Sequence, residues 1–349
     1  MIQSLRVCNQ RRPNRCGIIR PVTEARKWPV DSVTPQMIRE ARERIKHSII
    51  KTPLVRLNVD DASASIFLKL ENLQPTGSFK VRGVSNALAL LGRRSTSKGV
   101  YTVSAGNMAQ ALAWRAKENG IPCSVIIPEN APKTKIEGIE RYGARIIPLG
   151  FDEVWDVVKT HRYDPLEREG YSFIHPFADS RMIAGNGTIG FELLEDLPSL
   201  DSVVVPFGGG GLSAGIATAV KSLNPRIRVY ACEPETAAPL AASYSKGSAQ
   251  EIERIPSFVD GIGGKSVIPE IWKLVQPLLE GSIVVSLQQT ADALRLVLER
   301  NRVLAEGAGA ASVAAALTGK AGAGKVACIV SGGNIDPEKL VTIIHGRVP

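Results

Sequence analysis

The sequence predicts an α/β fold in which mostly parallel sheets carry helices on both faces. Short apolar runs of strand length alternate with longer runs of helical periodicity, and this alternation is typical of parallel sheets. The later strand-like runs are almost wholly apolar, as strands covered on both faces are. With 349 residues, 44% of them hydrophobic, the chain is long enough for two domains or one large one.

The first predicted helix begins near Thr34, a suitable N-cap, and Pro35 occupies its first position. Its apolar residues lie between 38 and 45. Apolar periodicity and turn residues predict the elements that follow. In chain order they are strands over 65–70 and 99–103, a helix over 109–119, a strand over 124–127, a helix over 131–142 ended by Gly143, strands over 145–149 and 203–207, a helix over 212–223, and strands over 228–232 and 326–330.

The order of these elements also predicts the domain organisation. Residues 99–178 form a self-contained run of alternating strands and helices, and the segments on both sides share glycine-rich motifs. We therefore predict a small α/β domain at 99–178 inserted into a large domain made of 34–98 and 179–349. The functional site is expected in the cleft between them. Residues 1–33 are a basic N-terminal extension that we expect to be disordered.

Charge and cysteine content exclude several functional classes. The net charge is +9, but residues 1–50 hold 11 Lys/Arg against 4 Asp/Glu, so the remainder is nearly neutral. Basic residues are not interleaved with aromatic ones, which argues against nucleic-acid binding. The five cysteines are far apart and form no C-x-x-C pair, as in reduced proteins. No apolar run approaches the roughly 20 residues of a membrane span, so a cytoplasmic protein is expected.

One lysine stands in a reactive setting. Lys80 follows a turn-prone Pro-Thr-Gly-Ser stretch and lies in an apolar strand-to-helix context, with Arg82 nearby. Burial and a neighbouring cation both lower the pKa of an amine, which a Schiff-base lysine needs before it attacks a carbonyl. A lone lysine is far more often an ordinary surface residue. Three other segments support the reactive interpretation.

The strongest of these segments is a run of four glycines, residues 208–211, between the strand at 203–207 and the helix at 212–223. Glycine leaves the backbone N–H groups unobstructed, and a helix N-terminus attracts anions, so this arrangement predicts a phosphate site. The run lacks the spacing of a dinucleotide-binding motif. Residues 319–325 match the start of a P-loop, but Val326 replaces the hydroxyl residue, and a helix precedes them instead of a strand. We interpret them as a helix-to-strand loop.

The other two segments suit an amino-acid ligand. Residues 104–110 leave a strand and enter a helix, so their free N–H groups could bind a carboxylate. Ser331 follows the strand at 326–330 and places a neutral hydroxyl at the carboxyl edge of the sheet, where open α/β folds bind ligands. A lysine, a phosphate site, a carboxylate site and a hydroxyl are together what pyridoxal phosphate with an amino-acid substrate requires.

Over about residues 34–336 the chain resembles fold-type II pyridoxal-phosphate enzymes of the serine/threonine dehydratase and serine racemase family, with a tryptophan synthase β-like fold. The segments that carry the resemblance are 76–80, 104–107, 183–188, 208–212 and 331–334. The resemblance implies Lys80 as the catalytic Schiff-base residue. It implies cofactor contacts by Phe79, Lys80, Asn107, Gly208, Gly209, Gly210, Gly211, Leu212, Glu306 and Ser331, and substrate contacts by Ser104, Ala105, Gly106, Asn107 and Met108.

The activity that the resemblance implies is β-elimination from a β-hydroxy amino acid such as L-threonine or L-serine, giving a 2-oxo acid and ammonia. A homo-oligomer, dimer or tetramer, is expected. Two positions depart from the family pattern: Ala105 replaces the serine that racemases use as an acid/base, and Met108 stands where relatives carry histidine. A divalent-cation site of some relatives is matched at Glu233, but Pro239 replaces its acidic ligand, so no metal is predicted.

Three alternatives stay open at this point. A sibling activity on the same scaffold, such as serine racemisation, hydroxyaspartate dehydration or β-replacement, would use the same residues. A phosphate- or nucleotide-binding protein without covalent chemistry is supported by the near-match at 319–325 alone. A scaffold that binds cofactor without turnover is disfavoured by the intact Lys80.

Overall fold

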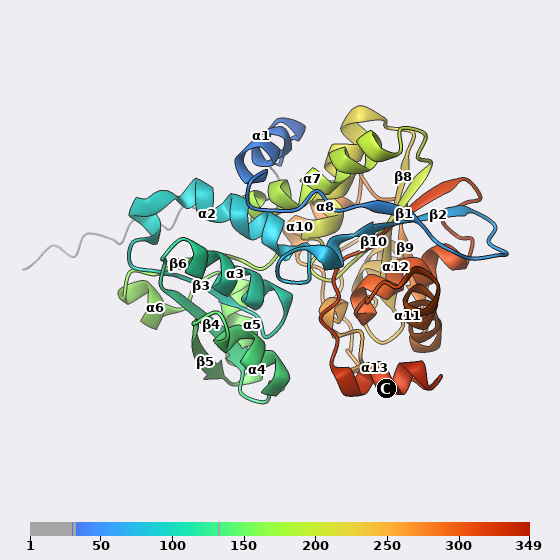
Figure 1. Ribbon diagram of the computed structural model, residues 1–349. Coiled ribbons are helices and arrows are strands. Elements are labelled where there is room, and N and C mark those ends of the chain that lie inside the picture. The colour runs from blue at the N-terminus through green and yellow to red at the C-terminus, as the bar shows by residue number, and fades with distance from the viewer. Residues whose placement is uncertain (1–29, 31–32, 132) are drawn as a thin grey trace, which may run out of the picture.

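The computed structural model describes residue 30 and residues 33–349 apart from 132, and it contains two sheets. We call the six-stranded sheet with its helices the large lobe, and the four-stranded sheet with α3 to α6 the small lobe (Figure 1). The strands of the large lobe are β1 (Leu54–Arg56), β2 (Ser65–Leu70), β7 (Ser202–Pro206), β8 (Arg228–Pro234), β9 (Ser282–Val285) and β10 (Lys325–Val330). Those of the small lobe are β3 (Val100–Val103), β4 (Cys123–Pro128), β5 (Arg145–Leu149) and β6 (Ser172–Phe173).

The strand order of the large sheet is β1-β2-β10-β7-β8-β9, and every pair is parallel except β1 with β2. In the centre, Val326 of β10 pairs with Ile66 of β2 on one side and with Ser202 of β7 on the other. Ala327 and Ile329 face one hydrophobic core, whereas the residues between and beside them face a second core. This double burial explains why the central strands read as continuous apolar runs.

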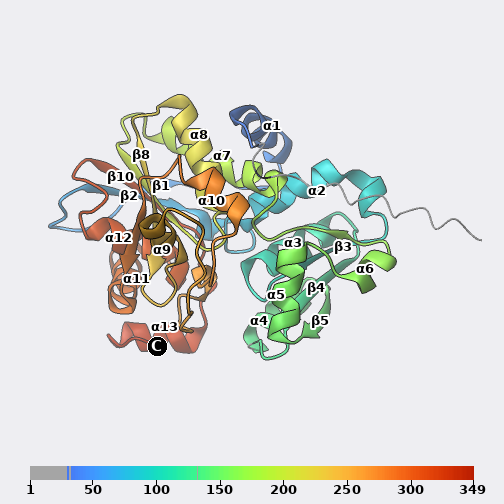
Figure 2. The same cartoon turned by 180° about the vertical axis from the view of Figure 1, so that it is seen from behind.

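Helices cover both faces of this sheet, as Figures 1 and 2 show from opposite sides. One core packs α1, α7, α8 and α10 on the sheet, and the other packs α11 and α12. The helices are α1 (Pro35–Ile45), α2 (Lys80–Thr96), α3 (Asn107–Glu118), α4 (Lys133–Glu140), α5 (Phe151–Thr160), α6 (Asp164–Arg168), α7 (Ser180–Asp196), α8 (Gly211–Leu223), α9 (Pro239–Lys246), α10 (Pro269–Val275), α11 (Leu287–Asn301), α12 (Gly307–Leu317) and α13 (Pro337–Ile344), with 3₁₀ turns η2 (Glu71–Leu73) and η3 (Asp260–Ile262).

The small sheet has the order β5-β4-β3-β6 and is parallel throughout. The side chains of α3 form its core with β4 and with the buried half of α2. Because the strands are parallel, the loops that leave β3 and β6 emerge at the same edge of the sheet. The loop after β3 leads to Asn107 and the loop after β6 leads to Phe177, and both residues contact the large lobe.

Most predicted elements occur with small shifts at their ends. Thr34 caps α1 by accepting a hydrogen bond from the Met37 amide at 3.3 Å, and the strands at 65–70 and 145–149 have the predicted bounds. Helix α3 begins two residues earlier than predicted, because Gly106 is its N-cap. Helix α4 ends two residues early, and Gly143 closes a separate turn with φ +75°. The two-residue strand β6 was not predicted.

Residues 319–325 lie in a loop between α12 and β10, ending on the first residue of the strand. Of the predicted N-terminal extension, the structure describes Val30 and Val33, and both are buried in a core of the large lobe. The rest of that prediction falls outside the described residues. Within the described part of the chain, no helix combines the length and apolar character needed to cross a membrane.

Candidate active site

Lys80 is the first residue of α2 and is held there by a tight turn. Gly77 in this turn has φ +69°, and a Cβ at this position would overlap the side chain of Asn334. Two backbone hydrogen bonds join the turn to the end of β10: the Gly333 amide donates to the Gly77 carbonyl at 2.9 Å, and the Phe79 amide donates to the Ser331 carbonyl at 3.0 Å. The large sheet therefore fixes the backbone position of Lys80 at the start of α2.

The Lys80 amine donates to the carbonyl of Pro176 at 2.6 Å and lies 5.2 Å from the centroid of the Phe79 ring. Burial lowers the pKa of this amine to about 8, against a weaker opposing attraction from Glu306. A pKa near neutrality leaves a useful fraction of the amine uncharged and nucleophilic. The sequence predicted this shift, but it assigned part of it to Arg82, and that part is wrong.

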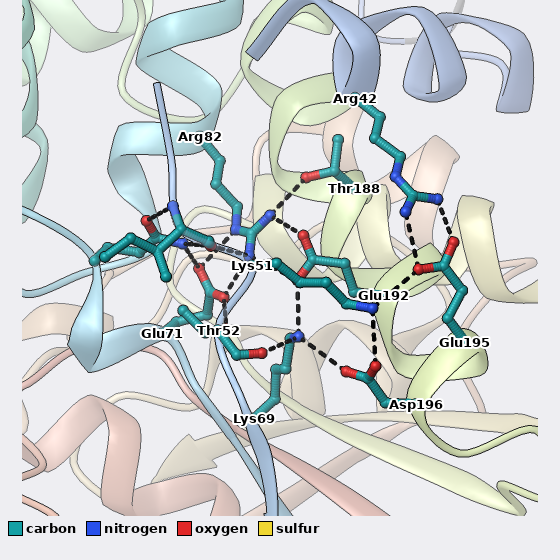
Figure 3. Close-up of polar contacts among 12 residues, drawn as sticks. Arg42, Lys51, Thr52, Lys69, Glu71, Arg82, Thr188, Glu192, Glu195 and Asp196 are labelled. Atoms are coloured by element: carbon teal, nitrogen blue, oxygen red, sulfur yellow. Dashed lines mark hydrogen bonds and ion pairs between the residues drawn. The ribbon is translucent and has the colours of Figure 1, made fainter. Parts of the chain in front are cut away.

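The guanidinium of Arg82 is fully buried and paired with two carboxylates (Figure 3). Its Nε donates to Glu71 at 2.7 Å and its Nη1 to Glu192 at 2.6 Å, and Lys69 also reaches Glu192 at 2.7 Å. We call these four residues the buried ion network. It joins the first turn of α2 to β2, η2 and α7, so it anchors the helix that carries Lys80. Removing one partner of such a buried pair typically lowers the free energy of unfolding by about 3–5 kcal/mol.

The four-glycine loop, residues 208–211, runs from β7 into α8, and its last three positions have no room for side chains. A Cβ at Gly209 would overlap the ring of Phe177, one at Gly210 would overlap Ile271, and one at Gly211 would lie 2.6 Å from the Phe177 carbonyl. Gly210 has φ +83°, which glycine adopts readily. The N–H groups of the first turn of α8 have no partner within the helix, so they can bind an anion.

The substrate-loop candidates lie between β3 and α3. Ser104 accepts a hydrogen bond from the Gly106 amide at 3.1 Å, and Ala105 is half-buried at the edge of the small-lobe core. A Cβ at Gly106 would meet no atom within 4 Å. Met108 is 1% exposed and packs in the small-lobe core, so its side chain has no accessible surface for a substrate.

Asn107 links this loop to the large lobe. Its amide donates to Glu306 at 2.8 Å, and its carbonyl oxygen accepts from Asn334 at 2.8 Å. Glu306 is the N-cap of α12, and burial, reinforced by Asp260, raises the pKa of its carboxyl to about 7. A carboxyl with this pKa changes charge near neutral pH, and it lies within Coulomb reach of Lys80.

The structure thus links Lys80 with the glycine loop and, through Glu306, with Asn107, whereas Met108 stays in the small-lobe core. Ser331, which is buried, belongs to the segment that pairs with the Lys80 turn, and Gly332 lies against Glu306 and Asn107. Leu212 is buried in the first turn of α8, after the glycine loop. An amine with a lowered pKa beside an anion site that lacks Cβ atoms fits pyridoxal phosphate, which has an aldehyde and a phosphate monoester.

Pro176 and Phe177 are site residues that were not predicted from the sequence. They follow His175 just after β6, next to the loop that leaves the neighbouring strand β3. A signal was available, because loops at the carboxyl ends of adjacent parallel strands meet at one edge. Asn334 lies in the segment 331–334 that carries the family resemblance, but no site role was predicted for it.

Glu233, the partial match to a cation ligand, is buried at the end of β8. Its carboxylate accepts from the amides of Leu240 and Ala241 at 2.8 and 2.9 Å and from the hydroxyl of Ser282 at 2.6 Å. These bonds tie the carboxylate to the start of α9, and burial raises its pKa to about 7.

Comparisons with known proteins agree with this geometry. Residues 45–332 match a family model described as pyridoxal-phosphate dependent enzyme. The chain is 40% identical to an L-threonine ammonia-lyase of Thermotoga maritima over 318 residues, which are 90% of this chain and 78% of the relative. It is 36% identical to a catabolic L-threonine dehydratase of Staphylococcus aureus, covering 88% of this chain and 91% of the relative.

Solved structures show the same likeness. Maize serine racemase superposes with a TM-score of 0.81 at 36% identity, covering 90% of this chain and 97% of that one. The processed form of threonine deaminase isoform 2 from Solanum lycopersicum also gives a TM-score of 0.81, at 30% identity, covering 89% of this chain and 87% of that one.

Proposed function

Because the chain belongs to the family of pyridoxal-phosphate-dependent enzymes, we propose that it is an ammonia-lyase that removes water and then ammonia from L-threonine or L-serine. The products are a 2-oxo acid and ammonia. One observation carries the proposal: Lys80, an amine with a pKa of about 8, contacts Pro176, and the next residue, Phe177, packs against the glycine loop.

The residues divide the work between binding and proton transfer. The amides of residues 208–212 would hold the phosphate, and Lys80 would hold the aldehyde carbon. When bound, the cofactor supplies an electron sink for the negative charge that develops at the substrate α-carbon. Once the substrate amine has displaced it from the aldehyde carbon, the freed Lys80 amine would take the proton from the α-carbon, as a general base with a pKa near the working pH can. The amides at 104–107 would orient the substrate carboxylate.

Ser331 would face the pyridine nitrogen. A neutral hydroxyl there does not enforce protonation of the ring as a carboxylate does, so the electron sink is weaker. A weaker sink favours rapid loss of a β-leaving group over reactions that need a long-lived carbanion. This preference supports elimination.

A racemase is the second candidate, and the structural likeness to maize serine racemase favours it. Ala105 argues against it, since a methyl group offers no proton on the face opposite Lys80. Release of 2-oxo acid, measured beside chiral analysis of the residual serine, separates the two activities. The same substrate panel, extended to hydroxyaspartate and to β-replacement with added nucleophiles, covers the remaining sibling activities.

The decisive control is Lys80→Ala, a change at a helix position where alanine is well tolerated. We expect a folded protein without the visible absorbance of lysine-bound cofactor, and a loss of 2-oxo acid release of at least about 10²–10⁴-fold. Release at the wild-type rate would contradict the proposal.

We also propose a homo-oligomer and a cytoplasmic location. Three cysteines, Cys123, Cys232 and Cys328, are free and buried, which suits a reducing compartment. Light scattering of the purified chain tests the first point.

A further inference from the structure

His175 is a buried imidazole whose three hydrogen bonds are all to backbone. Its Nδ1 lies 3.2 Å from the Phe177 amide and 2.8 Å from the Ala178 amide, and its Nε2 lies 3.2 Å from the Val158 carbonyl. An imidazole nitrogen that accepts from an N–H group carries no proton of its own. The geometry therefore requires a neutral ring with the proton on Nε2, and burial, which lowers the pKa of His175 well below its ordinary value, agrees.

These bonds shape the turn at residues 176–178, which we call the histidine-bound turn. Two of its amides point inward to one nitrogen, so the carbonyl of Pro176 is free to face Lys80, whose amine lies 2.6 Å away. The same turn presses on the phosphate site: the Phe177 ring contacts Gly209, and the Phe177 carbonyl packs against Gly211. One short segment thus touches both the reactive amine and the anion-binding amides.

We propose that His175 is a positioning residue of the active site. By accepting both amides on Nδ1 it fixes the histidine-bound turn, and this turn sets the position of the Lys80 amine relative to the glycine loop. The inference rests on the proposed function, because it gives that function its geometry. The role is distinct from catalysis, since the ring contacts neither Lys80 nor the glycines within hydrogen-bond distance.

Packing alone does not account for this residue. The ring lies in an aromatic cluster, 4.3 Å from His161 and 4.5 Å from Phe177 between centroids, and a phenylalanine would fill the same place. A buried polar ring is costly unless its bonds are made. Here the bonds converge on the one turn that joins the two halves of the site.

The first test uses the unaltered protein. The chain has four histidines, so proton–nitrogen correlation spectra of full-length protein with isotope-labelled histidine resolve few ring signals. Substituting the other three histidines one at a time assigns the His175 signal by elimination. We expect an Nε2-protonated, Nδ1-bare ring at neutral and alkaline pH. An Nδ1-protonated ring would overturn the proposal, because that nitrogen could not accept the two amides.

The second test uses a matched pair of variants. His175→Asn places an amide oxygen near the Nδ1 position and keeps the acceptor, whereas His175→Gln keeps a donor near the Nε2 position and loses that acceptor. Two readouts are independent of turnover: the pH profile of Lys80 reductive methylation in cofactor-free protein, followed by peptide mass spectrometry, and the dissociation constant for pyridoxal phosphate. We expect His175→Gln to weaken cofactor binding by about tenfold, as loss of a buried acceptor for two donors would, and to shift the Lys80 profile. His175→Asn should stay within about twofold.

Thr102→Val controls for general damage to the small lobe. Thr102 is fully buried and donates to the Ile174 carbonyl at 2.8 Å, next to His175, but does not contact the histidine-bound turn. It should lower the melting temperature and leave both readouts unchanged. If His175→Gln and His175→Asn both match this control, His175 is structural only and the proposal fails. If Lys80→Ala releases 2-oxo acid at the wild-type rate while the His175 pair differs as stated, the proposed function fails and the positioning role stands.

Discussion

The two loops that we propose bind anions are built in opposite ways. In the glycine loop, residues 209–211 are packed so closely against Phe177 and Ile271 that no side chain fits, whereas the loop at 104–107, called the substrate loop below, has open space beside Gly106. Both precede the N-terminus of a helix, α8 in one case and α3 in the other. The glycine loop is held by packing, and the substrate loop is held by the hydrogen bonds of Asn107 to Glu306 and Asn334.

This difference shows how one site could bind both a phosphate, which is always the same, and amino-acid substrates, which differ in their side chains. A phosphate has one shape, so its loop gains from rigid packing and bare amides. The loop at 104–107 would bind the carboxylate of substrates whose side chains differ, so it gains from open space beside that carboxylate and from side-chain tethers that single substitutions can alter. Three experiments test whether the loops differ in this sense.

The largest effect is expected from Gly209→Ala. The added Cβ would overlap the Phe177 ring near its attachment point, so the loop must shift, and overpacking of this kind costs about 1–3 kcal/mol. If the shift turns the amides away from the phosphate, cofactor affinity falls by about tenfold to a hundredfold. Titration with pyridoxal phosphate measures the dissociation constant of each variant.

Gly264→Ala is the matched control for that change. Its Cβ would lie 3.5 Å from the Gly208 carbonyl, an ordinary contact beside the same loop. Its cofactor affinity should stay close to that of the wild type. Equal losses of cofactor affinity in both variants would show that any change near the glycine loop weakens binding. Close packing at Gly209 would then not explain the effect.

An intermediate effect is expected from Glu306→Gln, and it should depend on pH. The pKa of this carboxyl is raised from 4.5 to about 7, so between these values the folded protein holds a proton that the unfolded chain has lost. The stability of the wild type therefore carries a contribution that is present below pH 4.5 and is lost as the pH rises to about 7.

The glutamine variant does not titrate, so its stability relative to the wild type should increase across that window by up to about 3 kcal/mol. Urea unfolding of the cofactor-free proteins at a series of pH values measures this. A difference that is constant with pH, or that decreases, would contradict the raised pKa. Cofactor affinity should change less than in Gly209→Ala, because Glu306 tethers the other loop.

The smallest effect is expected from Gly106→Ala. A methyl group there meets open space, and surface changes of this kind usually alter stability by less than about 0.5 kcal/mol. Cofactor affinity should be unchanged, while KM for threonine and serine should rise because the methyl group occupies space beside the substrate amides. Melting curves and steady-state kinetics measure the two properties. A loss of cofactor like that of Gly209→Ala would refute the distinction.

Local chemistry could be predicted from the sequence, and long-range packing could not. A strand, four glycines and a helix define an anion site within a dozen residues, and the turn before Lys80 is likewise encoded locally. The contacts that place Phe177 behind Gly209 join residues that are distant in the chain. The error about Arg82 has the same origin, since its partner Glu192 lies 110 positions away.

The buried ion network has one further consequence, which follows from its sum of charges. Arg82 and Lys69 are cations, Glu71 and Glu192 are carboxylates, and the total is zero. The anchor of α2 is therefore electrically silent toward an amine two residues away, and the proton affinity of Lys80 is left to burial and to Glu306. A substitution at position 306 can therefore change the proton affinity of Lys80 without removing an ion pair that anchors α2.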